Sequence, residues 1–404
     1  MFRSRVPLLW SGGVGLKSNH FCQGERGWEG GTILASCARY NSLAMKNSFF
    51  CSRILFLLFV LLLPFVVEGQ GRASAQVKDG ELQFANLGAF KLVNGQIILD
   101  CRIGYRTFGH LNPEKSNAIL FPTWASGVSE QLMGQAAPGK LADPTKYFVI
   151  LVDALANGVS SSPSNSPLQP RMQFPMITMR DMVNSQHELL NQLGIHHLKA
   201  VVGISMGGMQ TFQWIVSYPD FMDKAIPIVG SPRLAAYDLV LWQMEIDAIK
   251  SDASWNNGEY KENPAKRLFA EFWVLMGETP QRRNQELTRE KVAEFLDQET
   301  QKPAMDANDH IRQMEAMMSL DVSDRFGGSA HEGSMEKAAA AVKAKVLVVV
   351  ATNDHVVTPG PAREFAKLLG ADLLELNGDC GHQDRKSTRL NSSHVRLSRM
   401  PSSA

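Results

Sequence analysis

Short apolar runs rich in β-branched and aromatic residues recur between residues 97 and 376. Such runs predict strands. Seven of them are found, at Ile97–Tyr105, Ala118–Phe121, Tyr147–Val152, Leu198–Ile204, Lys224–Val229, Lys345–Val350 and Asp372–Leu376. The run Tyr147–Val152 (YFVILV) is apolar throughout, as expected for a strand that is covered on both faces.

Amphipathic stretches lie between several of these runs. Apolar residues at helical spacing predict helices at Met182–Leu193 and Pro361–Leu369, and a glycine follows each of them. Strands that alternate with helices indicate an α/β fold, with a mainly parallel sheet and helices on both faces.

The alternation is interrupted between residues 232 and 340, where no strong strand pattern occurs. This segment holds helical runs at Leu234–Lys250, Pro264–Met276, Thr288–Gln298 and Pro303–Leu320. We interpret it as a helical cap inserted between two parts of one core, residues 76–231 and 341–384. The loop Asn157–Pro170 is polar and 14 residues long, which favours a functional role.

One motif at the end of a predicted strand indicates the chemistry. Residues 203–207 read Gly-Ile-Ser-Met-Gly, and a helical run follows them. In the α/β-hydrolase fold, Gly-x-Ser-x-Gly forms a tight strand-to-helix turn, the nucleophile elbow, which exposes the serine above the sheet. We therefore predict Ser205 as a nucleophile; the alternative is a glycine-rich structural turn.

A serine nucleophile needs a base, and the base needs an acid that orients it. In this fold the order along the chain is serine, acid, histidine. Asp354 follows the predicted strand that ends near Val350, and His382 follows the last strand. We predict these two residues as acid and base, with Asp379 and Asp384 as rival acids.

The oxyanion of an acyl-transfer intermediate needs two N–H donors. One is the backbone N–H of Met206, directly after the nucleophile. The other is expected from the loop Phe121–Gly127 after an early strand, where either Trp124 or Ala125 would supply it.

The two ends of the chain differ from its body. The 14-residue apolar run Ile54–Val67 follows basic residues and precedes Ala73-Ser74-Ala75. This pattern predicts a signal peptide over residues 45–75, removed before Gln76; the alternative is an uncleaved membrane anchor. We expect residues 1–44 to be a doubtful leader before the true start, and residues 385–404 to be a foreign or frame-shifted basic tail.

The net charge of the chain body differs from that of the whole chain. The whole chain has a formal charge of +1, but residues 76–384 hold 28 basic and 37 acidic side chains, a net charge of −9. This balance argues against a nucleic-acid partner. The sequence shows no metal-ligand cluster and no phosphate-binding loop, so we expect no cofactor. Cys101 and Cys380 remain after cleavage, and we favour free thiols over a disulfide.

Three segments between residues 98 and 384 resemble the homoserine O-acetyltransferase family of the α/β-hydrolase fold. They are FPMITMRDMV at 174–183, SMGGMQ at 205–210 with Trp214 and Tyr218-Pro219-Asp220, and Asn353-Asp354 with Gly381-His382. The resemblance implies the same three catalytic residues. It suggests Arg180 as a contact for a substrate carboxylate, although a structural ion pair is the simpler interpretation. Dimers are common in this family.

The resemblance implies transfer of an acyl group from acyl-CoA to a substrate hydroxyl. Two features depart from it: residues 121–127 lack the family's His-x-Leu-Thr-Gly-like segment, and export would remove the enzyme from acyl-CoA. We therefore favour an exported esterase-like hydrolase, periplasmic or secreted, that acts on a small ester and touches the membrane only through its signal segment. The alternatives are a genuine O-acyltransferase with acyl-CoA as co-substrate, cytoplasmic if the signal is misread, and a non-catalytic binding protein on the same fold.

Overall fold

The structure is a computed structural model that describes residues 78–326 and 333–386. The predicted leader and signal peptide, and all but the first residues of the predicted tail, lie outside these ranges. In the described part of the chain, no helix has the length and apolar character needed to cross a membrane.

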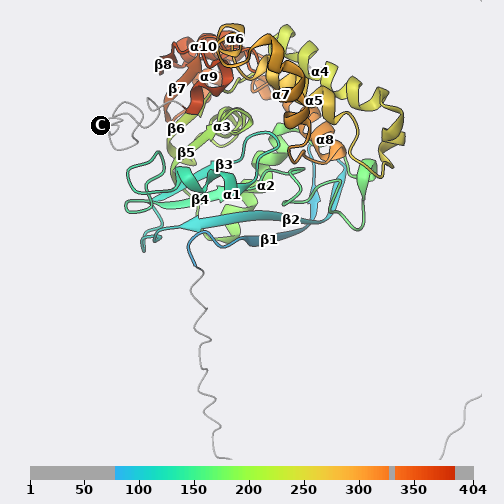
Figure 1. The fold of residues 1–404 in the computed structure, drawn as a ribbon. Helices are drawn as coiled ribbons and strands as arrows, with labels where there is room; N and C mark the ends of the chain where they lie inside the picture. The colour runs from blue at the N-terminus through green and yellow to red at the C-terminus, as the bar shows by residue number, and fades with distance from the viewer. Residues whose placement is uncertain (1–77, 327–332, 387–404) are drawn as a thin grey trace, which may run out of the picture. The chain divides into compact units, whose positions relative to one another are not determined.

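Eight strands form one sheet in the order β1-β2-β4-β3-β5-β6-β7-β8 (Figure 1). Their bounds are β1 Gln83–Lys91, β2 Ile97–Phe108, β3 Ala118–Pro122, β4 Phe148–Val152, β5 Leu198–Ile204, β6 Met222–Ile228, β7 Lys345–Ala351 and β8 Asp372–Leu376. β1 pairs with β2 and β2 with β4 in antiparallel orientation, whereas all pairs from β4 to β8 are parallel. The predicted mainly parallel sheet is confirmed.

Successive residues of the central strands enter two different cores. Ala118 and Leu120 of β3 pack in one core, and Ile119 and Phe121 pack in the other. This is the two-residue period of a strand that is buried on both faces. Most of the helical apolar residues belong to the first core, through α2 (Met179–Gln192), α3 (Met206–Ser217) and α10 (Gly360–Leu369). The short helix α1 (Ser129–Leu132) contributes to the second core.

β1 is the strand that the sequence pattern did not predict. Its sequence, QFANLGAFK, contains Gly88 at a φ of 62°, and the pairing with β2 shifts register on both sides of that glycine. These irregularities disrupt the apolar–polar alternation by which a half-buried strand is recognised.

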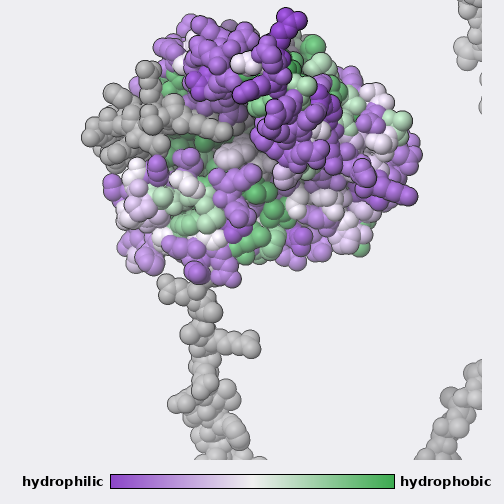
Figure 2. Space-filling model, viewed as in Figure 1, coloured by the Kyte–Doolittle hydropathy of each residue, from purple (hydrophilic) through white to green (hydrophobic). Residues whose placement is uncertain are grey.

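The segment between β6 and β7 is helical. Its helices are α4 Ala236–Ser251, α5 Lys266–Met276, α6 Pro280–Glu286, α7 Val292–Thr300, α8 Ala307–Met318 and α9 Met335–Ala341. Figure 2 shows that hydrophilic residues cover much of the visible face around α6 and α7. Short 3-10 turns also occur, within this segment and elsewhere in the described chain, at Met133–Gln135, Arg171–Gln173, Ala253–Gly258, Arg289–Lys291, Asp324–Phe326 and Gly381–Lys386. α9 packs against α10 and α3 of the core.

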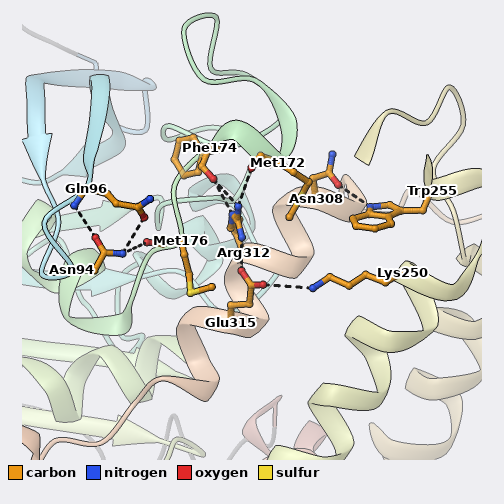
Figure 3. A network of polar contacts seen from close by, with 10 residues as sticks. All are labelled: Asn94, Gln96, Met172, Phe174, Met176, Lys250, Trp255, Asn308, Arg312 and Glu315. Atoms are coloured by element: carbon orange, nitrogen blue, oxygen red, sulfur yellow. Dashed lines mark hydrogen bonds and ion pairs between the residues drawn. The ribbon is translucent and has the colours of Figure 1, made fainter. Parts of the chain in front are cut away.

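Arg312 of α8 joins the cap to the core (Figure 3). Its side chain is 9% exposed; its guanidinium donates hydrogen bonds to the carbonyl oxygens of Phe174 and Met172 and pairs with Glu315 at 2.7 Å. Lys250 of α4 lies 3.8 Å from the other oxygen of Glu315. One planar cation therefore satisfies two core carbonyls and one cap carboxylate.

We expect Arg312→Lys to lower the free energy of unfolding by about 2 kcal/mol, because one ammonium group cannot reproduce this fork of donors. The measurement is urea denaturation. Arg267→Lys is the matched control, since Arg267 also contacts two cap carboxylates but is 45% exposed; its expected cost is below about 1 kcal/mol. Equal losses in the two variants would contradict the proposed role of Arg312.

Candidate functional site

The turn between β5 and α3 holds Ser205 in a strained conformation. Ser205 has φ 58° and ψ −122°, which few non-glycine residues adopt. A Cβ on Gly203 would lie 2.0 Å from the carbonyl oxygen of Gly207, and one on Gly207 would lie 2.6 Å from that of Pro122. The backbone at these two positions is therefore too close to its neighbours for any side chain.

The structure brings Ser205, His382 and Asp354 together from three separate loops. His382 Nε2 lies 2.9 Å from Ser205 Oγ, and His382 Nδ1 lies 2.6 Å from Asp354 Oδ2. His382 is fully buried, and Ser205 and Asp354 are 7% and 4% exposed. Because Asp354 accepts a hydrogen bond from the Nδ1–H group, the neutral imidazole presents Nε2 as an acceptor to the serine hydroxyl.

The loop after β7 fixes the Asp354 carboxylate. Its second oxygen, Oδ1, accepts hydrogen bonds from the backbone N–H groups of Val356 and Val357 at 2.8 and 3.0 Å. Of the rival acids, Asp379 accepts a hydrogen bond from the Thr279 hydroxyl through its backbone carbonyl. Asp384 is buried beside Gly378.

Backbone N–H groups suited to an oxyanion lie beside Ser205. Ala125 lines the same pocket as Ser205, whereas the N–H of Ser126 is already bonded to Gln313 Oε1 at 2.8 Å. Within the described ranges, the N–H groups of Met206, Trp124 and Ala125 have no protein acceptor. Ala125, unlike Trp124, is one of the residues that line the Ser205 pocket.

The pocket at Ser205 is narrow, with a cavity volume of about 20 Å³, and it is partly open to solvent. Its walls come largely from the cap and are mostly apolar, with Trp242, Trp273, Met314, Met317 and Val356. Glu245 and His310 also line it. Sequence reasoning missed both residues, because each stands alone in a helical run without a motif around it.

Arg180 is not one of the residues that line this pocket. It is in the first turn of α2, next to Asp181. The Asp181 carboxylate accepts hydrogen bonds from the Thr178 hydroxyl and from the Val93 N–H. The segment around Arg180 therefore connects α2 to the turn after β1.

The 14-residue loop at 157–170 connects the core to α8. Ser164 donates to Asp309 through its N–H at 2.9 Å and its hydroxyl at 2.6 Å. Asp309 is 1% exposed, and burial raises its pKa from 3.8 to about 7. This carboxyl therefore holds a proton in the folded protein at a pH where it would be ionised in the unfolded chain.

Because of this pKa shift, we expect the protonated Asp309 carboxyl to make the folded protein more stable at acidic pH. The folded state binds the proton more tightly, so stability should fall as the pH rises from about 4 to 7, by about 2 kcal/mol between pH 5 and pH 7. Burial also raises the pKa values of Asp153, Asp181 and Asp238. To isolate the contribution of Asp309, the free energy of unfolding is measured by urea denaturation at several pH values for wild type and for Asp309→Asn. The variant should lose the part of the pH dependence that Asp309 causes. Parallel pH profiles would contradict the assignment.

The two described cysteines are free: Cys101 is buried in β2, and Cys380 is partly exposed near His382. Burial raises the pKa of Cys101 to about 12, so its thiol is protonated at neutral pH. In the described ranges, no three His, Cys, Asp or Glu side chains are grouped as a metal site.

Residues 124–384 match the model of the alpha/beta hydrolase fold family. The chain is 34% identical to an ethyl acetate hydrolase of Pseudomonas veronii over 75% of this chain and 89% of that protein. It is 32% identical to a homoserine O-acetyltransferase of Methanococcoides burtonii over 73% of this chain and 68% of that protein. The structure of an acetylester hydrolase from Corynebacterium glutamicum superposes with a TM-score of 0.70 at 32% identity, over 76% of this chain and 92% of that one.

Proposed function

The chain belongs to the homoserine O-acetyltransferase-like group of the α/β-hydrolase family, and on that premise we propose that it hydrolyses small esters through an acyl-enzyme on Ser205. The observation that carries this proposal is the hydrogen-bonded chain from Ser205 through His382 to Asp354. It lies at a pocket beneath the cap, next to backbone N–H groups that have no protein acceptor within the described ranges.

In the proposed reaction, His382 Nε2 takes the hydroxyl proton as Ser205 Oγ attacks the ester carbonyl carbon. Asp354 stabilises the imidazolium that forms. The N–H groups of Met206 and Ala125 (or Trp124) stabilise the oxyanion. The intermediate collapses, the C–O bond to the alcohol breaks, and His382 returns its proton to the leaving oxygen. Water, deprotonated by His382, then attacks the acyl-enzyme and releases the acid and free Ser205.

Water as the final acceptor is the point that separates a hydrolase from a transferase. Support comes from the ester hydrolases that resemble this chain over about nine-tenths of their own length. Export would add support, because acyl-CoA is a cytoplasmic metabolite. The relationship to a homoserine O-acetyltransferase favours the second candidate, an O-acyltransferase that uses acyl-CoA.

One assay separates these candidates. Protein starting at Gln76 is tested with ethyl acetate by titration of released acid, and with acetyl-CoA plus homoserine by detection of free CoA. We expect acid release without any acceptor other than water. Homoserine-dependent release of CoA would contradict the hydrolase assignment, and failure to turn over either substrate would favour a binding protein.

We further propose that the protein is exported after cleavage before Gln76. The signal pattern at 45–75 supports this, although that segment lies outside the described residues. N-terminal sequencing of protein from the extracytoplasmic fraction should begin at Gln76. A mature protein that retains the apolar run 54–67 would indicate a membrane anchor instead.

A further inference from the structure

A second hydrogen-bonded chain of polar side chains reaches the pocket at Ser205, with Glu245 and His310 buried and Ser126 exposed to solvent, and the proposed mechanism does not use it. His310 Nε2 lies 2.7 Å from Glu245 Oε2, and His310 Nδ1 lies 3.3 Å from Ser126 Oγ. The side chains of His310 and Glu245 are 8% and 6% exposed. All three residues line the same pocket as Ser205.

Several contacts hold this chain in place. Ser126 has a positive φ of 59° and donates its N–H to Gln313 Oε1 at 2.8 Å. The His310 ring packs edge-on against Phe269, with ring centroids 4.7 Å apart. A strained serine and a buried imidazole that is hydrogen-bonded on both nitrogens indicate a preorganised polar group at the pocket wall.

The same residues stand where the Ser205 pocket meets a larger hollow in the cap. This hollow has a cavity volume of about 250 Å³, is partly open to solvent, and is bounded by α5 and by residues 299–305. It shares Ser126, Trp273 and His310 with the Ser205 pocket. If a substrate bound at Ser205 is too large for the Ser205 pocket, the rest of it would therefore extend past Ser126 and His310 into this hollow.

We propose that Ser126 and His310, with Glu245 behind them, form a polar subsite that binds a hydroxyl group of the ester. This rests on the proposed function and names its substrate class: short hydroxyesters, with the hydroxyl on the acyl or the alcohol part. When the Ser126 hydroxyl donates to His310 Nδ1, its lone pairs remain free to accept a hydrogen bond from the substrate hydroxyl. An alkyl group at the same place would leave Ser126 and His310 facing an apolar surface, which costs binding energy.

The test compares pairs of esters that have nearly the same shape. 2-Hydroxyethyl acetate is compared with propyl acetate, and ethyl hydroxyacetate with ethyl propionate, by kcat/KM from titration of released acid. Each value is divided by the rate constant of alkaline hydrolysis of the same ester, which removes intrinsic reactivity. We expect about tenfold or greater preference for the hydroxyester in one pair, because a site built to hydrogen-bond a hydroxyl rejects the analogue without it. The pair that shows the preference identifies the side of the ester.

Ser126→Ala and His310→Phe should each lower that preference by about tenfold, through a higher KM for the hydroxyester. Ser251→Ala, an exposed position at the end of α4, is the control and should leave the ratio unchanged. Ser126→Ala removes a single oxygen, so it tests the subsite even if His310→Phe fails to fold.

Two results would overturn the subsite alone: a wild type that turns over both members of each pair equally, or a preference that survives in folded Ser126→Ala. If the wild type turns over no ester at all, the proposed function fails and the subsite fails with it.

Discussion

Ser205→Ala is expected to lower kcat for ethyl acetate by about 10⁴- to 10⁶-fold, with little change in the melting temperature. The reason is that the proposed reaction passes through a covalent bond to Ser205 Oγ, the atom 2.9 Å from His382 Nε2. Without that atom, water would have to attack the ester directly. The measurement is the acid-release assay at saturating ester, with circular dichroism to establish that the variant is folded.

Ser217→Ala is the matched control, because Ser217 ends the same helix that Ser205 precedes and its hydroxyl accepts only from Gln213 among the described contacts. Its activity should remain within about twofold of wild type. Substantial activity in Ser205→Ala would remove Ser205 as the nucleophile. Ser126, 3.3 Å from a second imidazole, would then be the serine to examine next.

Gly203→Ala is expected to have the largest effect on the fold. The added Cβ would lie 2.0 Å from the carbonyl oxygen of Gly207 and 2.7 Å from the Thr211 hydroxyl oxygen. These neighbours belong to the first turns of α3, so β5 and α3 would have to separate. We expect a loss of about 4 kcal/mol or more, or no soluble folded protein, and loss of activity with it.

Gly134→Ala provides the control for this substitution. A Cβ at Gly134 meets no atom within 4 Å, and its φ is not positive. Its expected effect on the urea midpoint is within about 0.5 kcal/mol of wild type. Near-native stability and activity of Gly203→Ala would show that the turn can relax, and that glycine is not required there.

Most strands of the parallel sheet could be predicted because they are buried on both faces, whereas the edge strand β8 is largely exposed and was found from its short apolar run. β5 and β8 have the bounds expected from their apolar runs, and β7 differs by one residue at its end. The helices of the cap were predicted with larger errors at their ends. α6 was missed, because its polar sequence PQRRNQE has no apolar period. The proline at its first position favours the start of a helix, but it is not sufficient by itself.

The chain order of Ser205, Asp354 and His382 was also available from the sequence. Parallel strands end at the same edge of a sheet, so residues just after β5, β7 and β8 must lie near one another. The contacts of Ser126 could not be found in this way. Ser126 and His310 are 184 residues apart in the chain, and no local pattern relates a core loop to a cap helix.

The sequence by itself determined the α/β sheet, the glycine turn at Ser205 and the order of the three residues proposed for catalysis. It could do so because strand periodicity and tight turns depend on neighbouring residues. The tertiary structure alone decided that the Asp354 carboxylate lies 2.6 Å from His382 Nδ1, that Arg180 is outside the pocket, and that Glu245 and His310 are within it. These outcomes depend on how the loops after the strands meet and on how the cap packs over the sheet, and both are set by contacts between residues far apart in the chain.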